Sequence, residues 1–219
     1  GLGCPAAAVL AASGVGSLAL ADPDQVDLTN LHRQLLYRTA DVGRPKVDAA
    51  VERLRRIYPT LAVTLEGLRL SVDATNAERL FRSADLVVDG TDSIETKFLS
   101  NDVALGAGVP LVVGGAVGWQ GTVLCVARGA GACYRCLFEA PPEPGEIPSC
   151  ADAGILGAVA GVVGALAGGA AIALLTGEAR GGDLWSYDAR ADRIRRTAPA
   201  RRAGCTSCRD NTRINEITQ

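Results

Sequence analysis

The chain contains no methionine, a single histidine and few aromatic side chains. The lone His32 lies beside Arg33 and Gln34, and it does not form a Ser/His/Asp or Cys/His catalytic set, so we interpret it as structural. A net charge of −2 gives no overall electrostatic case for nucleic acid. The opening residues lack the basic stretch of a signal peptide, and we expect a cytoplasmic domain. Because Met is also missing at position 1, we expect residue 1 to be a truncation point.

Residues 153–175 form an apolar run without charge that is dominated by Gly and Ala. The run is long enough to cross a bilayer, and Gly157 and Gly161 have the spacing of close-packed membrane helices. Its flanks carry Asp152 and Glu178 instead of basic residues. We therefore predict no membrane span but a buried helix, or two short helices at a domain or dimer interface, where the small residues would let backbones approach closely.

The region 190–213 is locally basic. We interpret it as a solvated face; the alternative is a docking surface for an acidic protein or a nucleic acid. Its arginines are Arg190, Arg193, Arg195, Arg196, Arg201, Arg202, Arg209 and Arg213.

Strand and helix patterns alternate over the first half of the chain. Helices are predicted over 4–14, 45–58, 76–82 and 95–106, and strands over 17–21, 62–65, 85–89 and 109–113. This order predicts an α/β fold, Rossmann-like and doubly wound, whose sheet is mainly parallel and whose strands at 17–21, 85–89 and 109–113 are buried. Segments 120–126 and 184–187 resemble antiparallel additions, and the proline-rich segment 138–149 is expected to be a mobile loop.

Two C-x-x-C pairs are the most specific local signal. Cys133 and Cys136 form one pair, and Cys205 and Cys208 form the other. Two such pairs complete a tetrahedral site of four sulfurs, which predicts a structural zinc that staples the C-terminal region to the body. A dithiol redox motif is the competing interpretation, but it needs only one pair.

A polar loop follows the apolar run that ends at Ala21. Its side chains suit a ribose, a polyphosphate and a metal ion together, and a loop after a strand is where open α/β sheets bind ligands. The candidate residues are Asp22, Asp24, Asn30, Arg33, Gln34 and Lys46. Gly1 and Gly3 precede the first helix, as the rear part of a glycine-rich phosphate turn does.

A second polar turn, Asp89-Gly90-Thr91-Asp92-Ser93, follows the predicted strand at 85–89. Asp92 is a candidate for Mg²⁺, although either Asp92 or Ser93 could instead cap the next helix. Cys150 precedes a predicted helix, and a helix N-terminus favours a thiolate, so Cys150 is a candidate nucleophile.

Together these motifs resemble the ThiF/MoeB/HesA family, the bacterial relatives of ubiquitin-activating enzymes. The resemblance rests on G-L-G-C at the start, D-P-D-Q-V-D-L-T-N-L-H-R-Q, G-R-P-K, G-T-D-S, C-Y-R-C-L, S-C-A-D-A-G and C-T-S-C. It implies an adenylating domain over 1–210, with residues 211–219 as a tail or the start of a linker. It also implies a homodimer that uses Mg-ATP to adenylate the C-terminal Gly-Gly carboxylate of a ubiquitin-like sulfur carrier, with a rhodanese or a cysteine desulfurase as sulfur donor.

The resemblance also implies roles for single residues. Asp22 would hold the ribose hydroxyls; Asn30, Arg33 and Lys46 would contact phosphates; and Gln34 would support the nucleotide. Asp92 would bind Mg²⁺. Cys150 matches the cysteine that in some members attacks the acyl-adenylate or forms a persulfide linkage.

Three departures from the family pattern stand out. The first glycines of the phosphate loop and the N-terminal arm are absent, Ser93 stands where Asn is common, and Asn211–Gln219 resembles a linker cut short. The fragment is therefore expected to lack part of its site and could be inactive. Rival interpretations are a nicotinamide-dependent oxidoreductase, a zinc-stapled scaffold without catalysis, and a family member that adenylates a carboxylate on transfer RNA.

Overall fold

The computed structural model describes residues 1–60, 62–142 and 154–208. Within them the helices are α1 (Gly3–Ala12), α2 (Lys46–Ile57), α3 (Ala77–Arg82), α4 (Ile94–Ala107), α5 (Tyr134–Leu137) and α7 (Gly157–Leu175). The strands are β1 (Ser17–Ala21), β2 (Thr64–Leu68), β3 (Val87–Asp89), β4 (Leu111–Val117), β5 (Gln120–Val126), β6 (Leu184–Asp188) and β7 (Arg193–Thr197). Two short 3₁₀ turns, η1 (Leu28–Asn30) and η2 (Thr39–Asp41), lie in the loop between β1 and α2.

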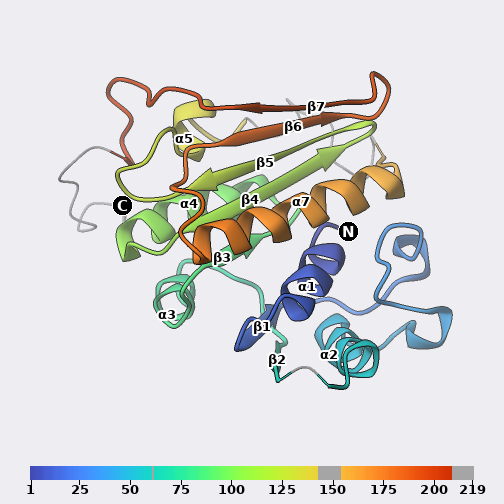
Figure 1. Cartoon of the computed structure of the whole chain (residues 1–219). Coiled ribbons are helices and arrows are strands. Elements are labelled where there is room, and N and C mark those ends of the chain that lie inside the picture. The colour runs from blue at the N-terminus through green and yellow to red at the C-terminus, as the bar shows by residue number, and fades with distance from the viewer. Residues whose placement is uncertain (61, 143–153, 209–219) are drawn as a thin grey trace.

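The strands form two sheets. β1 and β2 pair in parallel, while the larger sheet has the order β3-β4-β5-β6-β7 (Figure 1). In the larger sheet β3 and β4 are parallel, and the three later pairs are antiparallel. The α/β class and the antiparallel additions are confirmed. Antiparallel strand pairs are more common than the prediction of a mainly parallel sheet implies, because β5, β6 and β7 of the C-terminal half add an antiparallel meander to the parallel β3–β4 pair.

Helices cover both faces of the larger sheet. Successive side chains of a strand point to opposite faces, so Val112 packs toward α1 and α7, whereas Leu111 and Val113 pack toward α3 and α4. A third core lies between α1, α2 and the small sheet. Helix α1 contributes to the first and third cores and so joins the two sheets.

The two strands next to α1 are less buried than the sequence suggested. In β1 exposed residues alternate with half-buried ones, and in β3 only Asp89 is fully buried. The prediction of buried strands was wrong here, because each of these strands pairs along one edge only within the described residues. Strand β4, which has partners on both sides, is buried over its first four residues as predicted.

Gly157–Leu175 of the apolar run form one continuous helix, α7, beside α1 and the sheet (Figure 1). A Cβ added at Gly164 would overlap Pro5 and the Leu2 carbonyl, and one at Gly168 would crowd Val9. The small residues therefore let α1 and α7 approach closely, as predicted. By length and composition α7 could also cross a membrane, and 39% of its most apolar window is buried. A single helix of this kind is weak evidence for a membrane span, because the core helix of a soluble protein passes the same test.

Strand β7 was not predicted. Its sequence, R-I-R-R-T, lies in the region interpreted as a basic solvated face, and all five residues are exposed. The sequence did not indicate this strand, because its residues are mostly charged and none of them is buried. Hydrogen bonds to β6 hold it in the sheet.

Candidate nucleotide site and metal cluster

The candidate nucleotide site lies where β1 and β3 end and α1 begins. Asp22 follows β1, and a bridge between Gln25 and Pro45 brings the start of α2 back to this point. Lys46 then donates its backbone N–H to the Asp24 carbonyl (2.9 Å) and its Nζ to Asp24 Oδ2 (2.7 Å). The same Nζ lies 3.8 Å from Asp22 Oδ1. The loop therefore assembles two carboxylates around one buried ammonium group.

The Asp22 carboxylate is held in a fixed orientation. Its Oδ1 accepts the backbone N–H of Asp24 at 2.9 Å. Burial raises the pKa of Asp22, and the Asp24 N–H and the Lys46 charge oppose that rise. Its Oδ2 makes neither of these two contacts, which suits an acceptor for hydroxyl groups.

Arg33 lies next to the start of α1. A Cβ added at Gly1 would be in ordinary van der Waals contact with Arg33 Cδ, at 3.6 Å, so the Arg33 side chain packs against the first residue. The Gly1 nitrogen lies within electrostatic reach of Arg33, Lys46 and Asp22. Arg33 Nη1 is also 2.8 Å from Nε2 of the exposed His32. Gly1, Arg33, Lys46 and Asp22 therefore belong to one electrostatic cluster.

Asn30 and Gln34 support this loop in different ways. The Asn30 carbonyl accepts the backbone N–H groups of Arg33 (3.1 Å) and Gln34 (3.0 Å). Gln34 is buried, and its Oε1 has no hydrogen-bond partner among the described residues. A buried acceptor without a partner is costly, so Gln34 is a group that a bound ligand or water would satisfy.

In the second polar turn the sequence left open whether Asp92 or Ser93 caps the next helix, and the structure assigns the cap to Ser93. Ser93 caps α4, since its Oγ accepts the backbone N–H of Thr96 at 3.1 Å. Asp92 is exposed and makes no hydrogen bond or ion pair with another candidate residue in the described part of the chain. A Cβ at Gly90 would be 3.1 Å from the Gly3 nitrogen, so this turn lies directly against the start of α1. Asp92 is thus carried next to the site with a free carboxylate.

Sequence reasoning missed the group that supports this turn. Lys97 and Asp89 are both buried, and Lys97 Nζ lies 3.4 Å from Asp89 Oδ1 and 2.7 Å from the Gly114 carbonyl. Burial opposes ionisation of Asp89, but Lys97 and Thr91 outweigh it and lower the pKa of this carboxyl. The only signal in the sequence was that Lys97 falls on the same helical face as Ser100 and Asn101. This pattern is equally typical of a polar surface.

The four paired cysteines converge, as predicted. Their sulfur atoms all lie within 4.8 Å of one another. The Sγ–Sγ distances are 3.7 Å for Cys133–Cys136, 3.6 Å for Cys133–Cys205 and 3.4 Å for Cys136–Cys208. Four sulfurs at about 2.3 Å from a tetrahedral zinc would be about 3.8 Å apart. The cluster could therefore hold a metal ion with little rearrangement.

The thiols of the cluster differ in how readily they ionise. Burial and the neighbouring cysteines raise the pKa of Cys133. At Cys136 burial acts in the same direction, but backbone N–H groups of Arg202 and Cys133 outweigh it and lower the pKa. One ligand is therefore readily available as a thiolate, the form that binds metal.

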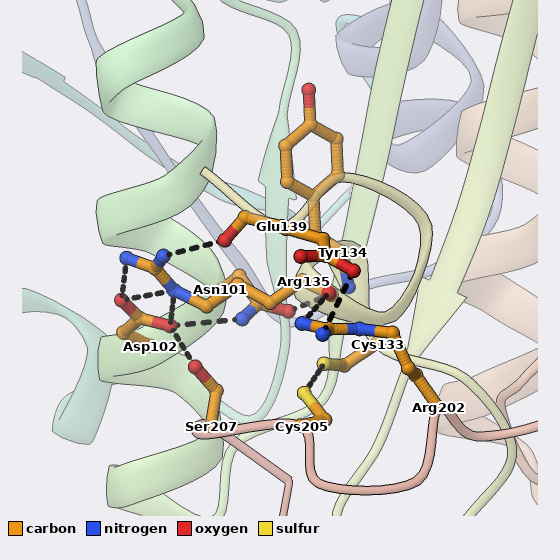
Figure 2. A network of polar contacts seen from close by, with 9 residues as sticks. All are labelled: Asn101, Asp102, Cys133, Tyr134, Arg135, Glu139, Arg202, Cys205 and Ser207. Atoms are coloured by element: carbon orange, nitrogen blue, oxygen red, sulfur yellow. Dashed lines mark hydrogen bonds and ion pairs between the residues drawn. The ribbon is translucent and has the colours of Figure 1, made fainter. Parts of the chain in front are cut away.

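A polar network ties the cluster to α4 (Figure 2). Asp102 accepts Arg135 Nη2 at 2.8 Å and, through its other oxygen, the Ser207 hydroxyl at 2.6 Å. The adjacent Asn101 accepts the backbone N–H of Tyr134 at 2.9 Å. Because Ser207 lies between Cys205 and Cys208, the second cysteine pair is fixed to α4 as well as to the first pair.

Several predicted features lie wholly or partly outside the described residues. These are Cys150, the candidate nucleophile, residues 143–149 of the proline-rich segment, Arg209 and Arg213 of the basic region, and the tail over 211–219. Cys4 and Cys125 are buried in the hydrophobic core.

The fold and these motifs match known proteins. A model of the ThiF family matches residues 1–208. The chain belongs to the ThiF family. It is 39% identical to a sulfur carrier protein adenylyltransferase of Thermus thermophilus, covering 99% of this chain and 82% of that protein. It is also 39% identical to the adenylyltransferase and sulfurtransferase MOCS3 of Arabidopsis thaliana, covering all of this chain but 47% of that protein.

This ThiF-family chain therefore spans most of one relative and about half of the MOCS3 proteins it matches. Among solved structures it resembles Escherichia coli MccB crystallised with ATP, with a TM-score of 0.80 and 22% identity. That match covers 95% of this chain and 64% of MccB. At this identity the likeness concerns the fold alone.

Proposed function

We propose that the protein is an ATP-dependent adenylyltransferase that activates the C-terminal glycine carboxylate of a ubiquitin-like sulfur carrier and releases pyrophosphate. The observation that carries the proposal is the cluster of Asp22, Asp24, Arg33 and Lys46 at the start of α1. Its relatives support the choice of acceptor, since the Thermus thermophilus protein is named a sulfur carrier protein adenylyltransferase.

The proposed reaction is an in-line attack of the carrier carboxylate on the α-phosphate of ATP, with pyrophosphate leaving. Such transfers depend mainly on position and on positive charge where negative charge develops. Asp22 would accept the ribose hydroxyls, Gln34 would support the nucleotide, and Gly1 and Gly3 would leave room for the phosphates. Asn30, Arg33 and Lys46 would contact the phosphates, and Lys46 would exchange part of its pairing with Asp24 for them.

Two metal ions fit residues that are present. The free carboxylate of Asp92 suits Mg²⁺, a hard cation that takes oxygen ligands, and Ser93 is the neighbouring cap of α4. Mg²⁺ would neutralise charge on the phosphates. Four convergent thiols from Cys133, Cys136, Cys205 and Cys208 suit Zn²⁺ in a site without an open position, hence a structural one.

The remaining assignments complete the proposal. The adenylating domain spans 1–210, works as a homodimer in the cytoplasm, and receives sulfur from a rhodanese or a cysteine desulfurase. Cys150 is the proposed nucleophile toward the acyl-adenylate. The free cysteines of the described residues and the four-thiol cluster support a reducing compartment.

Carrier-dependent exchange of pyrophosphate into ATP, measured on the full-length protein, tests the proposal. Lys46→Ala and Asp92→Ala should each lower the exchange rate by at least about 100-fold, with zinc content unchanged. Arg56→Ala on the exposed side of α2 is the matched control and should leave exchange intact. Retained exchange in either site variant would contradict the assignment, and a change in NADH absorbance would favour an oxidoreductase.

A further inference from the structure

Strand β7 is the outermost strand of the larger sheet (Figure 1). It pairs with β6 through five residues, and within the described part of the chain its other edge pairs with no strand. All five residues are exposed, and Ile194 keeps 51% of its surface accessible. A free edge of this kind offers backbone N–H and C=O groups to any extended segment that reaches it.

The side chains of this edge are strongly basic. Arg193 and Arg195 lie opposite Asp188 and Ser186 in the register, on one face of the sheet, and neither forms an ion pair with a described residue. On the other face Arg196 binds Asp183 at 2.7 Å and stacks over Trp185 at 5.3 Å. Arg190 stacks over the ring of Trp119 at 5.4 Å. Two of these four arginines are therefore available to an acidic partner.

The edge begins on the same side of the sheet as the candidate nucleotide site. Arg193 pairs with Asp188, Asp188 with Gln120, and Gln120 with Val117, the last residue of β4. Because β3 and β4 are parallel, this is also the side on which β3 ends at Asp89. A protein seated on β7 could therefore direct a C-terminal tail across that side of the sheet toward the site.

We propose that the free edge of β7 binds an extended acidic segment of the carrier protein, with Arg193 and Arg195 selecting its charge. This inference rests on the proposed function, and it adds where the carrier docks and by what chemistry. A second copy of the chain fits this edge poorly, because antiparallel pairing of β7 with β7 over its five residues would place Arg195 opposite Arg195 and gather Arg193 and Arg195 of both copies on one face.

The test is the double variant Arg193→Glu/Arg195→Glu, compared with Arg56→Glu/Arg79→Glu. The control reverses two exposed arginines on α2 and α3 and changes the net charge equally. The β7 variant should weaken carrier binding by at least about tenfold and raise KM for the carrier, with kcat and KM for ATP unchanged. The control should change neither. Amide hydrogen exchange over 193–197 should slow when the carrier binds.

Direct titration of the carrier separates this inference from the proposed function. Binding that weakens only in the β7 variant supports the docking site even if no pyrophosphate exchange occurs. Unchanged affinity, or exchange over 193–197 that the carrier does not slow, would overturn it. Titration with a short RNA covers the other class of partner, since RNA binding lost in the β7 variant with carrier binding intact would assign this edge to nucleic acid.

Discussion

At the scale of single residues, neighbouring side chains in the two polar turns have different roles. Ser93 caps α4, and this leaves the Asp92 carboxylate free beside the start of α1. Lys46 is held by Asp24 and Asp22. The sequence alone indicated the residues of both turns as candidates. The folded backbone decides which of these residues contact one another.

The buried Lys97–Asp89 pair supports the turn that carries Asp92, and it provides a test of that support. Lys97→Met should destabilise the fold by about 3–5 kcal/mol, because it leaves a buried carboxylate without its partner. The double change Lys97→Met/Asp89→Asn should cost clearly less, since no charge remains. Urea unfolding of the single and double variants measures the difference, and additive losses would contradict the coupling.

The same pair predicts an effect of pH. The folded-state pKa of Asp89 is lowered, so its contribution is present above the unfolded pKa and is lost as pH falls through the folded value. Stability should therefore decline below about pH 4, and Asp89→Asn should flatten that decline. Thermal unfolding between pH 2 and about pH 6 gives the comparison; parallel curves for the two proteins would rule the assignment out.

At the scale of elements, α7 shows what a composition signal can and cannot decide. The run of small residues predicted close helix packing, which is confirmed by the contacts of Gly164 and Gly168 with α1. Whether the run formed one helix or two, and which face met α1, depended on residues elsewhere in the sequence. The charged strand β7 is the opposite case, because a pattern that reads as a solvated face formed the edge of a sheet.

Two glycines of α7 distinguish packing from helix propensity. Gly164→Ala should destabilise the protein by about 1–3 kcal/mol, since the added Cβ overlaps Pro5 and the Leu2 carbonyl. Gly161→Ala meets nothing within 4 Å and should stabilise the helix by up to about 1 kcal/mol. Chemical denaturation compares them, and similar shifts for both variants would contradict close packing at Gly164.

At the scale of the whole molecule, the four-cysteine cluster and the candidate nucleotide site lie apart. Cys133 and Cys205 pack with Leu111 and Val126, the first residue of β4 and the last of β5. The candidate nucleotide site lies beyond the other end of the β3–β4 pair, where β3 ends at Asp89. The cluster therefore stabilises the C-terminal region without contributing to the nucleotide site.

Removal of the metal should separate these two regions. A strong chelator should release about one zinc per chain and speed amide exchange over 133–138 and 198–208, because the cluster and the Asp102 network hold these segments together. Exchange in α2 and the binding of ATP should change little. Cys205→Ser should reproduce the effect, and equal loss of ATP binding would show that the cluster serves the nucleotide site directly.

The sequence by itself determined the α/β class, the pairing of two C-x-x-C motifs and the polar loop from Asp22 to Lys46, because each depends on spacing along the chain. It did not determine the exposure of β1 and β3, the existence of β7 or the buried Lys97–Asp89 pair. Those features depend on which strand edges find partners and which side chains meet across elements. Only the tertiary structure decides these, since it brings together groups whose separation in the sequence carries no signal.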